Sequence, residues 1–151
     1  MATVFIVDDD SRVVTALGRA LRTEGFHVEA PQTARQLLAQ VEHDEPSCVL
    51  LDMFLPGITG LEIQQELNAV MALPVIFLTG HRSVAASVQA MKQGAFDFLL
   101  KPVDMSLLLD TVRRALARSA DIMKLQDRED SHQPGSTAGP ALRSRGGRKP
   151  N

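Results

Sequence analysis

The chain has 151 residues, an apolar fraction of 44% and a formal net charge of −2. This length suffices for one domain with a sizeable core and a tail. The near-neutral total gives no electrostatic indication of a partner, but residues 1–127 carry an acidic excess and residues 128–151 a basic one.

The sequence also argues against membrane insertion and secretion. No apolar stretch approaches the roughly 20 residues that a bilayer span needs. Met1 leads directly into a strand-like segment without a basic region, so we expect no signal peptide. The only cysteine, Cys48, excludes an internal disulfide, and we expect it to be a small buried hydrophobe in the reducing cytoplasm.

The first half of the chain predicts three strands and two helices. Val4–Val7 is a short β-branched run typical of a strand buried on both faces. A helix follows and ends before Gly25, with its apolar positions at Val13, Val14, Leu17, Ala20 and Leu21. Weaker patterns predict a strand at 27–30 and a helix capped by Thr33. The apolar run from Cys48 predicts a third strand that ends on Asp52.

The second half repeats this alternation. Pro56 and Gly57 break the chain after Asp52, and a helical pattern then runs to about Met71 through Leu61, Ile63, Leu67 and Val70. Later strands are predicted at 75–79 and 96–100. The helix between them is marked by Val84, Val88 and Met91, and the last helix, capped by Asp104, by Leu107, Leu108, Val112, Ala115 and Leu116.

Five strand-then-helix units predict an α/β fold with a doubly wound parallel sheet. We assign residues 1–122 to this domain. Residues 123–151 include a Pro/Gly/Ser-rich stretch and a basic end that cannot bury apolar surface, so we expect a disordered tail.

Polar side chains follow four of the five predicted strands. Asp8, Asp9 and Asp10 follow the first, Asp52 ends the third, Thr79 the fourth, and Lys101 follows the fifth. The functional crevice of such a sheet lies at these carboxyl ends. Carboxylates brought together there repel one another unless a cation lies between them, and an all-oxygen ligand set suits Mg²⁺. The pattern predicts an aspartyl-phosphate site.

Each of these residues also has an ordinary structural explanation. Asp10 alone is more typical of a helix cap, Thr79 of a strand end, and Lys101 of a solvated surface. An aromatic such as Phe98, in a strand, is more often core than switch. Their joint occurrence at matching strand ends favours the functional interpretation.

These motifs resemble the receiver domain of two-component response regulators, and FixJ-like receivers in particular. The resemblance covers residues 3–119 and rests on four segments: Ile6–Asp10, Leu50–Gly60, Leu78–His81 and Phe98–Pro102. It implies a flavodoxin-like (βα)5 sheet of strand order 2-1-3-4-5. It also implies a cis peptide before Pro102.

The resemblance implies a role for each site residue. Asp52 would accept a phosphoryl group from a histidine kinase or phosphotransfer protein. Mg²⁺ would be bound by Asp9, Asp52 and the Phe54 backbone carbonyl, with Asp8 helping through water. Lys101 would pair with the phosphoryl oxygens. Thr79 and Phe98 would carry the switch to the face of the fourth helix, fifth strand and fifth helix, which would bind an unknown output partner or form a homodimer.

Other functions fit the residues less well. A Mg²⁺-dependent phosphatase of the haloacid dehalogenase type needs an acid two residues after its nucleophile, where this chain has Phe54. The basic tail has no aromatics and no helix-turn-helix pattern, so nucleic acid is not an expected partner. We therefore expect a phosphoacceptor switch and not an enzyme, either standing alone or as the receiver part of a longer DNA-binding regulator.

Overall fold

The computed structural model describes residues 2–41, 44–80 and 84–131. The described residues up to Asp121 form one compact unit, which contains the whole sheet. The strands are β1 (Thr3–Val7), β2 (His27–Glu29), β3 (Ser47–Asp52), β4 (Phe54–Leu55), β5 (Ile58–Thr59), β6 (Val75–Thr79) and β7 (Asp97–Leu100); the helices are α1 (Ser11–Thr23), α2 (Ala34–Gln40), α3 (Gly60–Asn68), α4 (Val84–Lys92) and α5 (Met105–Ser131).

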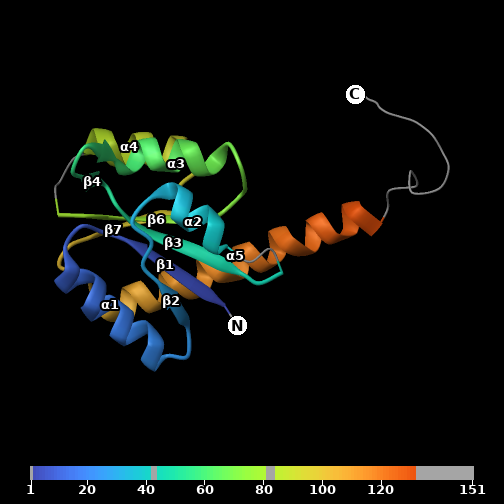
Figure 1. Ribbon diagram of the computed structural model, residues 1–151, viewed down its shortest axis with the longest axis horizontal. Coiled ribbons are helices and arrows are strands. Elements are labelled where there is room, and N and C mark those ends of the chain that lie inside the picture. Colours follow the sequence, from blue (N-terminus) through green and yellow to red (C-terminus); the bar gives the residue numbers. More distant parts are fainter. Residues whose placement is uncertain (1, 42–43, 81–83, 132–151) are drawn as a thin grey trace. The chain divides into compact units, whose positions relative to one another are not determined.

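The main sheet is parallel and has the order β2-β1-β3-β6-β7. Counted along its own five strands this is 2-1-3-4-5, so the predicted flavodoxin-like order is confirmed. Helices cover both faces of the sheet, with α1 and α5 on one and α2, α3 and α4 on the other (Figure 1). The central strands can therefore be apolar on both sides.

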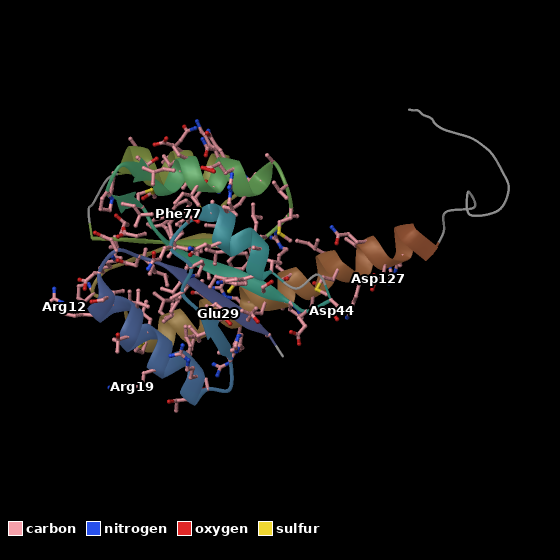
Figure 2. The ribbon with its side chains drawn as sticks, viewed as in Figure 1. Arg12, Arg19, Glu29, Asp44, Phe77 and Asp127 are labelled. Atoms are coloured by element: carbon pink, nitrogen blue, oxygen red, sulfur yellow. The ribbon has the colours of Figure 1, made fainter. Side chains whose placement is uncertain are left out.

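Each face of the sheet has its own core. Phe5, Leu51 and Phe77 point toward α2 and α3, whereas Leu50 and Ile76, on alternate positions of the same strands, pack with α1 and α5. Phe77 is fully buried, and Arg12 and Arg19 of α1 point outward (Figure 2). Cys48 is also fully buried as expected, and burial raises the pKa of its thiol to about 12.

A small hairpin that the sequence did not predict follows Asp52. The antiparallel strands β4 and β5 pair Phe54 with Thr59 and Leu55 with Ile58. Gly57 turns the chain between them with a φ of 78°, a conformation that glycine adopts readily. Two residues per strand give too short a pattern for periodicity to detect.

Gly60 lets this hairpin pack closely on the end of β3. Its N–H donates to the Met53 carbonyl at 2.8 Å, and the Met53 N–H donates to Leu78 O at 2.9 Å. A Cβ on Gly60 would lie 2.5 Å from the Asp52 carbonyl oxygen and 2.8 Å from a ring carbon of Phe77. Any larger residue would therefore displace the backbone of Asp52.

Some residues that the helical patterns placed in the core are exposed. Val70 lies beyond the end of α3, because the helix stops at Asn68 and not near Met71. Val88 and Met91 of α4 are 47% and 42% exposed, and Leu107 of α5 is 49% exposed. The spacing was correct for a helix, but these apolar positions lie outside the buried stripe.

The expected disorder of residues 123–151 was wrong in part, because α5 continues to Ser131. Met105 to Ser131 contains no glycine or proline, and both occur soon after, at Pro134 and Gly135. Residues 132–151 lie outside the described residues. Among the helices that the structure describes, none combines the length and the apolar character that a bilayer span requires.

We predict that Gly60→Ala destabilises the protein by about 1–3 kcal/mol, the usual cost of overpacking. Gly18→Ala is the matched control. Gly18 lies within α1, and its added Cβ would lie 3.1 Å from the flexible end of Arg22 and in ordinary contact, at 3.7 Å, with Val28, so alanine should stabilise the helix. Urea unfolding measures both changes. A Gly60→Ala protein as stable as the wild type would disprove the close-packing account.

Candidate functional site

The register of the sheet brings the acidic residues together. Val7 of β1 pairs with Leu51 of β3, so the next residues, Asp8 and Asp52, leave the two strands at the same level. Asp52 in turn pairs with Leu78, which places Thr79 one position further along β6. The sequence-predicted acids therefore converge because neighbouring parallel strands end together.

Three carboxylates form a tight cluster at this edge. Asp8, Asp9 and Asp52 each offer an oxygen, and these oxygens all lie within 4.8 Å of one another. The Asp8 side chain is fully buried and that of Asp52 is 9% exposed, whereas Asp9 is exposed. Such spacing suits ligands that surround one cation.

Lys101 forms ion pairs with two of these acids. Its Nζ lies 2.8 Å from Asp8 Oδ2 and 3.4 Å from Asp52 Oδ2. Burial alone would lower the pKa of the Lys101 ammonium, but the hydrogen bond to Asp8 and the charge of Asp52 outweigh it, and the pKa is raised. Lys101 therefore remains a cation at neutral pH, directed at the Asp52 carboxylate.

The Asp52 carboxylate is under electrostatic strain. Burial raises its pKa above the ordinary value, and the charge of Asp8 adds to the shift. The Phe54 N–H, which donates to Asp52 Oδ1 at 3.2 Å, and the Lys101 ammonium act in the opposite direction without cancelling it. The folded protein therefore holds an anion that a further cation would stabilise.

The remaining predicted residues lie nearby with differing exposure. Thr79 is buried at the end of β6, and its carbonyl accepts from the Lys101 N–H at 2.9 Å. Phe98 is partly buried against the core beside α3, in register with Phe77. The Lys101–Pro102 peptide is cis, as expected. A metal-binding role for the Phe54 carbonyl stays a prediction, and His81 lies outside the described residues.

Asp10 belongs to a helix cap. It is the N-cap of α1, and its side chain accepts from the Arg12 N–H at 2.9 Å. The Asp10 N–H itself donates to Asp8 Oδ1 at 2.9 Å, which helps to orient the Asp8 carboxylate. The cap interpretation of Asp10, which the sequence favoured for that residue taken alone, agrees with this geometry.

Sequence reasoning missed two backbone contributions to the site. The Phe54 N–H that holds Asp52 Oδ1 leaves no side-chain pattern to detect. The close packing of Gly60 could have been inferred from the sequence. Thr59 and Glu62 have the spacing of a capping box, which marks the start of α3, and the structure forms that box. A helix that begins directly at Gly60 implies close packing against the preceding strand end.

The donor set fits a divalent metal ion. Three carboxylates and one ammonium leave two negative charges, which one divalent cation balances. All donors are hard oxygens, and the exposed Asp9 gives access for ion-bound water, as Mg²⁺ prefers. The protein supplies few ligands, which leaves positions for a phosphate oxygen.

Curated relatives match this chain over part of their length. Nodulation protein W of Bradyrhizobium diazoefficiens is 42% identical over 118 residues, covering 78% of this chain and 52% of that protein. Transcriptional regulatory protein FixJ of Azorhizobium caulinodans is 39% identical over 125 residues, covering 82% and 59%. The chain thus spans a little over half the length of these two relatives.

Solved structures share the fold. Response regulator StyR superimposes with a TM-score of 0.78 at 37% identity, covering 86% of this chain and 66% of that one. The structure named FixJ-N superimposes with a TM-score of 0.70 at 33% identity, covering 78% of this chain and 94% of that one.

The family model described as the response regulator receiver domain matches residues 4–113. The matched range contains every residue of the acidic cluster and Lys101. With the parallel sheet order and the relatives above, this match shows that the chain belongs to the receiver-domain family of two-component response regulators.

Proposed function

We propose that this receiver accepts a phosphoryl group on Asp52, in a Mg²⁺-dependent transfer from a phosphohistidine on a partner kinase or phosphotransfer protein. One observation carries the proposal: oxygens of Asp8, Asp9 and Asp52 lie within 4.8 Å of one another while Lys101 Nζ lies 3.4 Å from Asp52 Oδ2. Among the described residues, this arrangement puts a carboxylate nucleophile beside both a cation site and a fixed ammonium.

The transfer needs a carboxylate oxygen free to attack phosphorus. Asp52 Oδ1 accepts from the Phe54 N–H, so Oδ2, on the side of Lys101, is the proposed nucleophile. A bond forms between Oδ2 and phosphorus while the bond from phosphorus to the histidine nitrogen breaks. The electron pair returns to the imidazole, which takes up a proton from water.

The positive groups of the site act on the charge of the phosphoryl oxygens. A bound Mg²⁺ would supply positive charge that offsets the negative charge developing during transfer. Asp9 and Asp52 would hold the ion, with the Phe54 carbonyl as a third ligand and Asp8 acting through water. Lys101 would exchange its contact with Asp52 Oδ2 for a phosphoryl oxygen without a large movement.

The same event would alter a distant surface. Thr79 ends β6 next to the site, and its hydroxyl would donate to the phosphoryl group, while Phe98 on β7 would turn inward behind it. The face formed by α4, β7 and the part of α5 before Asp121 has exposed apolar side chains at Val88, Met91, Leu100 and Leu107. We propose that this face binds the output partner or a second receiver.

Phosphorylation would then act by changing what this face binds, and not by making the protein a catalyst of repeated reactions. Because Cys48 is a free, buried thiol, which fits a reducing compartment, we propose that the chain acts in the cytoplasm. FixJ is named a transcriptional regulator. We propose that this receiver controls an equivalent output, carried on the same polypeptide or on a separate one.

We predict that incubation with acetyl phosphate and Mg²⁺ adds the mass of one phosphoryl group, and that Asp52→Asn abolishes the adduct. Asp10→Asn is the matched control. Asp10 lies beside the cluster but caps α1, and asparagine caps equally well, so its adduct should match that of the wild type. Intact-mass spectrometry measures all three proteins. An adduct that persists in Asp52→Asn would reject Asp52 as the acceptor, and steady release of inorganic phosphate would favour a phosphatase.

We also predict that Asp52→Asn stabilises the metal-free protein at pH 7. Burial and Asp8 raise the pKa of Asp52 in the folded state, so its protonation contributes stability that is lost as pH rises through that pKa. Ionised Asp52 therefore costs stability at neutral pH, and asparagine removes this cost. The advantage should shrink as the pH falls below the ordinary carboxyl pKa.

Urea unfolding at several pH values, without Mg²⁺, measures this difference. Mg²⁺ should then stabilise the wild type more than the variant, because the ion binds the folded carboxylates. A variant less stable than the wild type at pH 7 without Mg²⁺ would contradict the account of a strained Asp52.

A further inference from the structure

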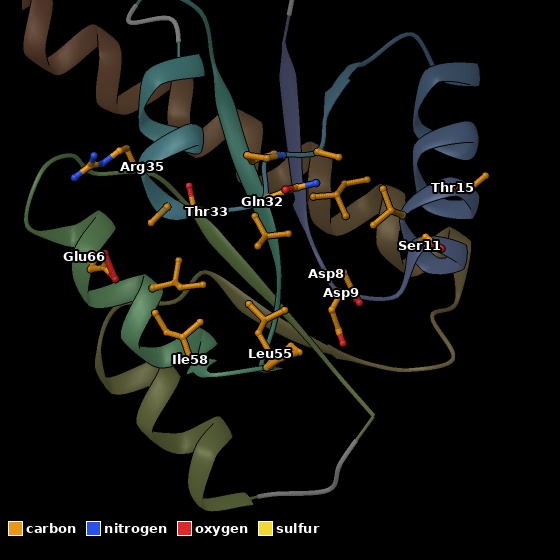
Figure 3. A pocket seen from close by; sticks show the side chains of 18 residues that line it. Asp8, Asp9, Ser11, Thr15, Gln32, Thr33, Arg35, Leu55, Ile58 and Glu66 are labelled. Carbon is orange, nitrogen blue, oxygen red and sulfur yellow. The ribbon is translucent and has the colours of Figure 1, made fainter.

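A cavity of about 730 Å³ opens beside the acidic cluster and is lined by Asp8 and Asp9 but not by Lys101 (Figure 3). Its walls come from the start of α1, the loop between β2 and α2, the β4–β5 hairpin and α3. This volume lies within the range of about 300–1,000 Å³ that is typical of small-molecule sites. The phosphoryl-transfer proposal uses only the two aspartates at its edge.

Most of the surface that lines the cavity is apolar. Val14 lines it from α1, Leu55 and Ile58 from the hairpin, and Ile63 from α3. Leu55 and Ile58 are only partly buried, so they keep apolar surface that a ligand would remove from water. A ligand with an aromatic or aliphatic body fits this lining.

The charged residues that line the cavity are two acids at one end and one base and one acid at the other. Asp8 and Asp9 lie together at the end of β1, whereas Arg35 and Glu66 lie across the cavity on α2 and α3 (Figure 3). Asp8 is already bound by Lys101. Within the described part of the chain, no hydrogen bond or ion pair engages the Asp9 carboxylate. The end beside β1 therefore offers one anion that is not neutralised by a neighbouring side chain.

We propose that this cavity binds an organic cation: a primary amine or guanidinium on an apolar body of drug-like size. The cationic group would pair with Asp9, and the body would lie against Val14, Leu55 and Ile58. A neutral ligand of the same shape would remove water from Asp9 without replacing it, which is costly for a carboxylate. An anion would meet the repulsion of Asp8 and Asp9 directly.

The bound cation would also affect the switch. Asp9 is shared with the proposed Mg²⁺ site. The hairpin against which the ligand would lie begins at Phe54, just after Asp52. The ligand and the divalent ion would therefore exclude one another, and the ligand would oppose phosphoryl acceptance. Only this consequence rests on the proposed function; the binding itself does not.

The first test compares 4-phenylbutylamine with 4-phenylbutan-1-ol, which has the same body without the charge. Each is titrated into ¹⁵N-labelled protein without metal, and amide chemical shifts are followed by NMR. The amine should give saturable shifts at Thr15, Ala34 and Ile58, which line the cavity, with at least tenfold higher affinity than the alcohol. Equal affinities, or no saturable shift with the amine, would overturn the proposal.

Two variants of α1 locate the binding. Thr15 lines the cavity and is exposed, so Thr15→Trp fills it without touching the acidic cluster; its neighbour Ala16 is also exposed but does not line it. Thr15→Trp should abolish the shifts at Ala34 and Ile58, and Ala16→Trp should leave the affinity unchanged. Wild-type affinity in Thr15→Trp would contradict the location.

Asp9→Asn should remove the preference for the amine over the alcohol, and a preference that survives would contradict the role of Asp9.

A Mg²⁺ arm separates this proposal from the proposed function. Mg²⁺ at a concentration that saturates its own shifts should weaken amine binding several-fold. Amine binding that is unchanged by Mg²⁺ would overturn the role of Asp9 in the metal site while the cavity assignment stands. If the amine does not bind the metal-free protein, the cavity assignment is overturned and the proposal of phosphoryl acceptance is unaffected.

Discussion

Mutual repulsion among Asp8, Asp9 and Asp52 is the constraint from which the chemistry of this domain follows. The parallel register fixes Asp8 and Asp52 at the same level of adjacent strands, so the fold itself prevents their separation. Lys101 relieves part of the repulsion and leaves charge for one divalent cation to balance. The site is thus held in a state that binding of an ion, and then of a phosphoryl group, can stabilise.

The surroundings of the cluster combine tight packing with open space. On one side Gly60 packs against the Asp52 carbonyl, and the Phe54 N–H holds one carboxylate oxygen, so Asp52 has little freedom to move. On the other side the β4–β5 hairpin and the start of α1 enclose a cavity beside Asp9. The buried acid is positioned precisely, whereas the exposed acid remains open to ions and ligands.

The strands and the convergence of the site could be predicted from sequence because both depend on local patterns. Apolar runs that stop on Asp8, Asp52 and Lys101 state where each strand ends, and parallel pairing then brings those ends together. The exposure of Val88 and Leu107 could not be predicted. Helical spacing shows which residues share one face of a helix, but not whether another element packs against that face. The hairpin and the Phe54 N–H contact arise from backbone geometry and leave almost no pattern in the side chains.

Paramagnetic broadening by Mn²⁺ tests the convergence of the three acids on one divalent ion most directly, because it reports distance from the bound ion residue by residue. In ¹⁵N-labelled wild-type protein, substoichiometric Mn²⁺ should first broaden the amide signals of Asp9, Met53 and the residues next to them, and Asp9→Asn should greatly weaken the effect. Broadening centred on acids of α5 such as Asp110 and Asp121, or a pattern unchanged by Asp9→Asn, would contradict the account.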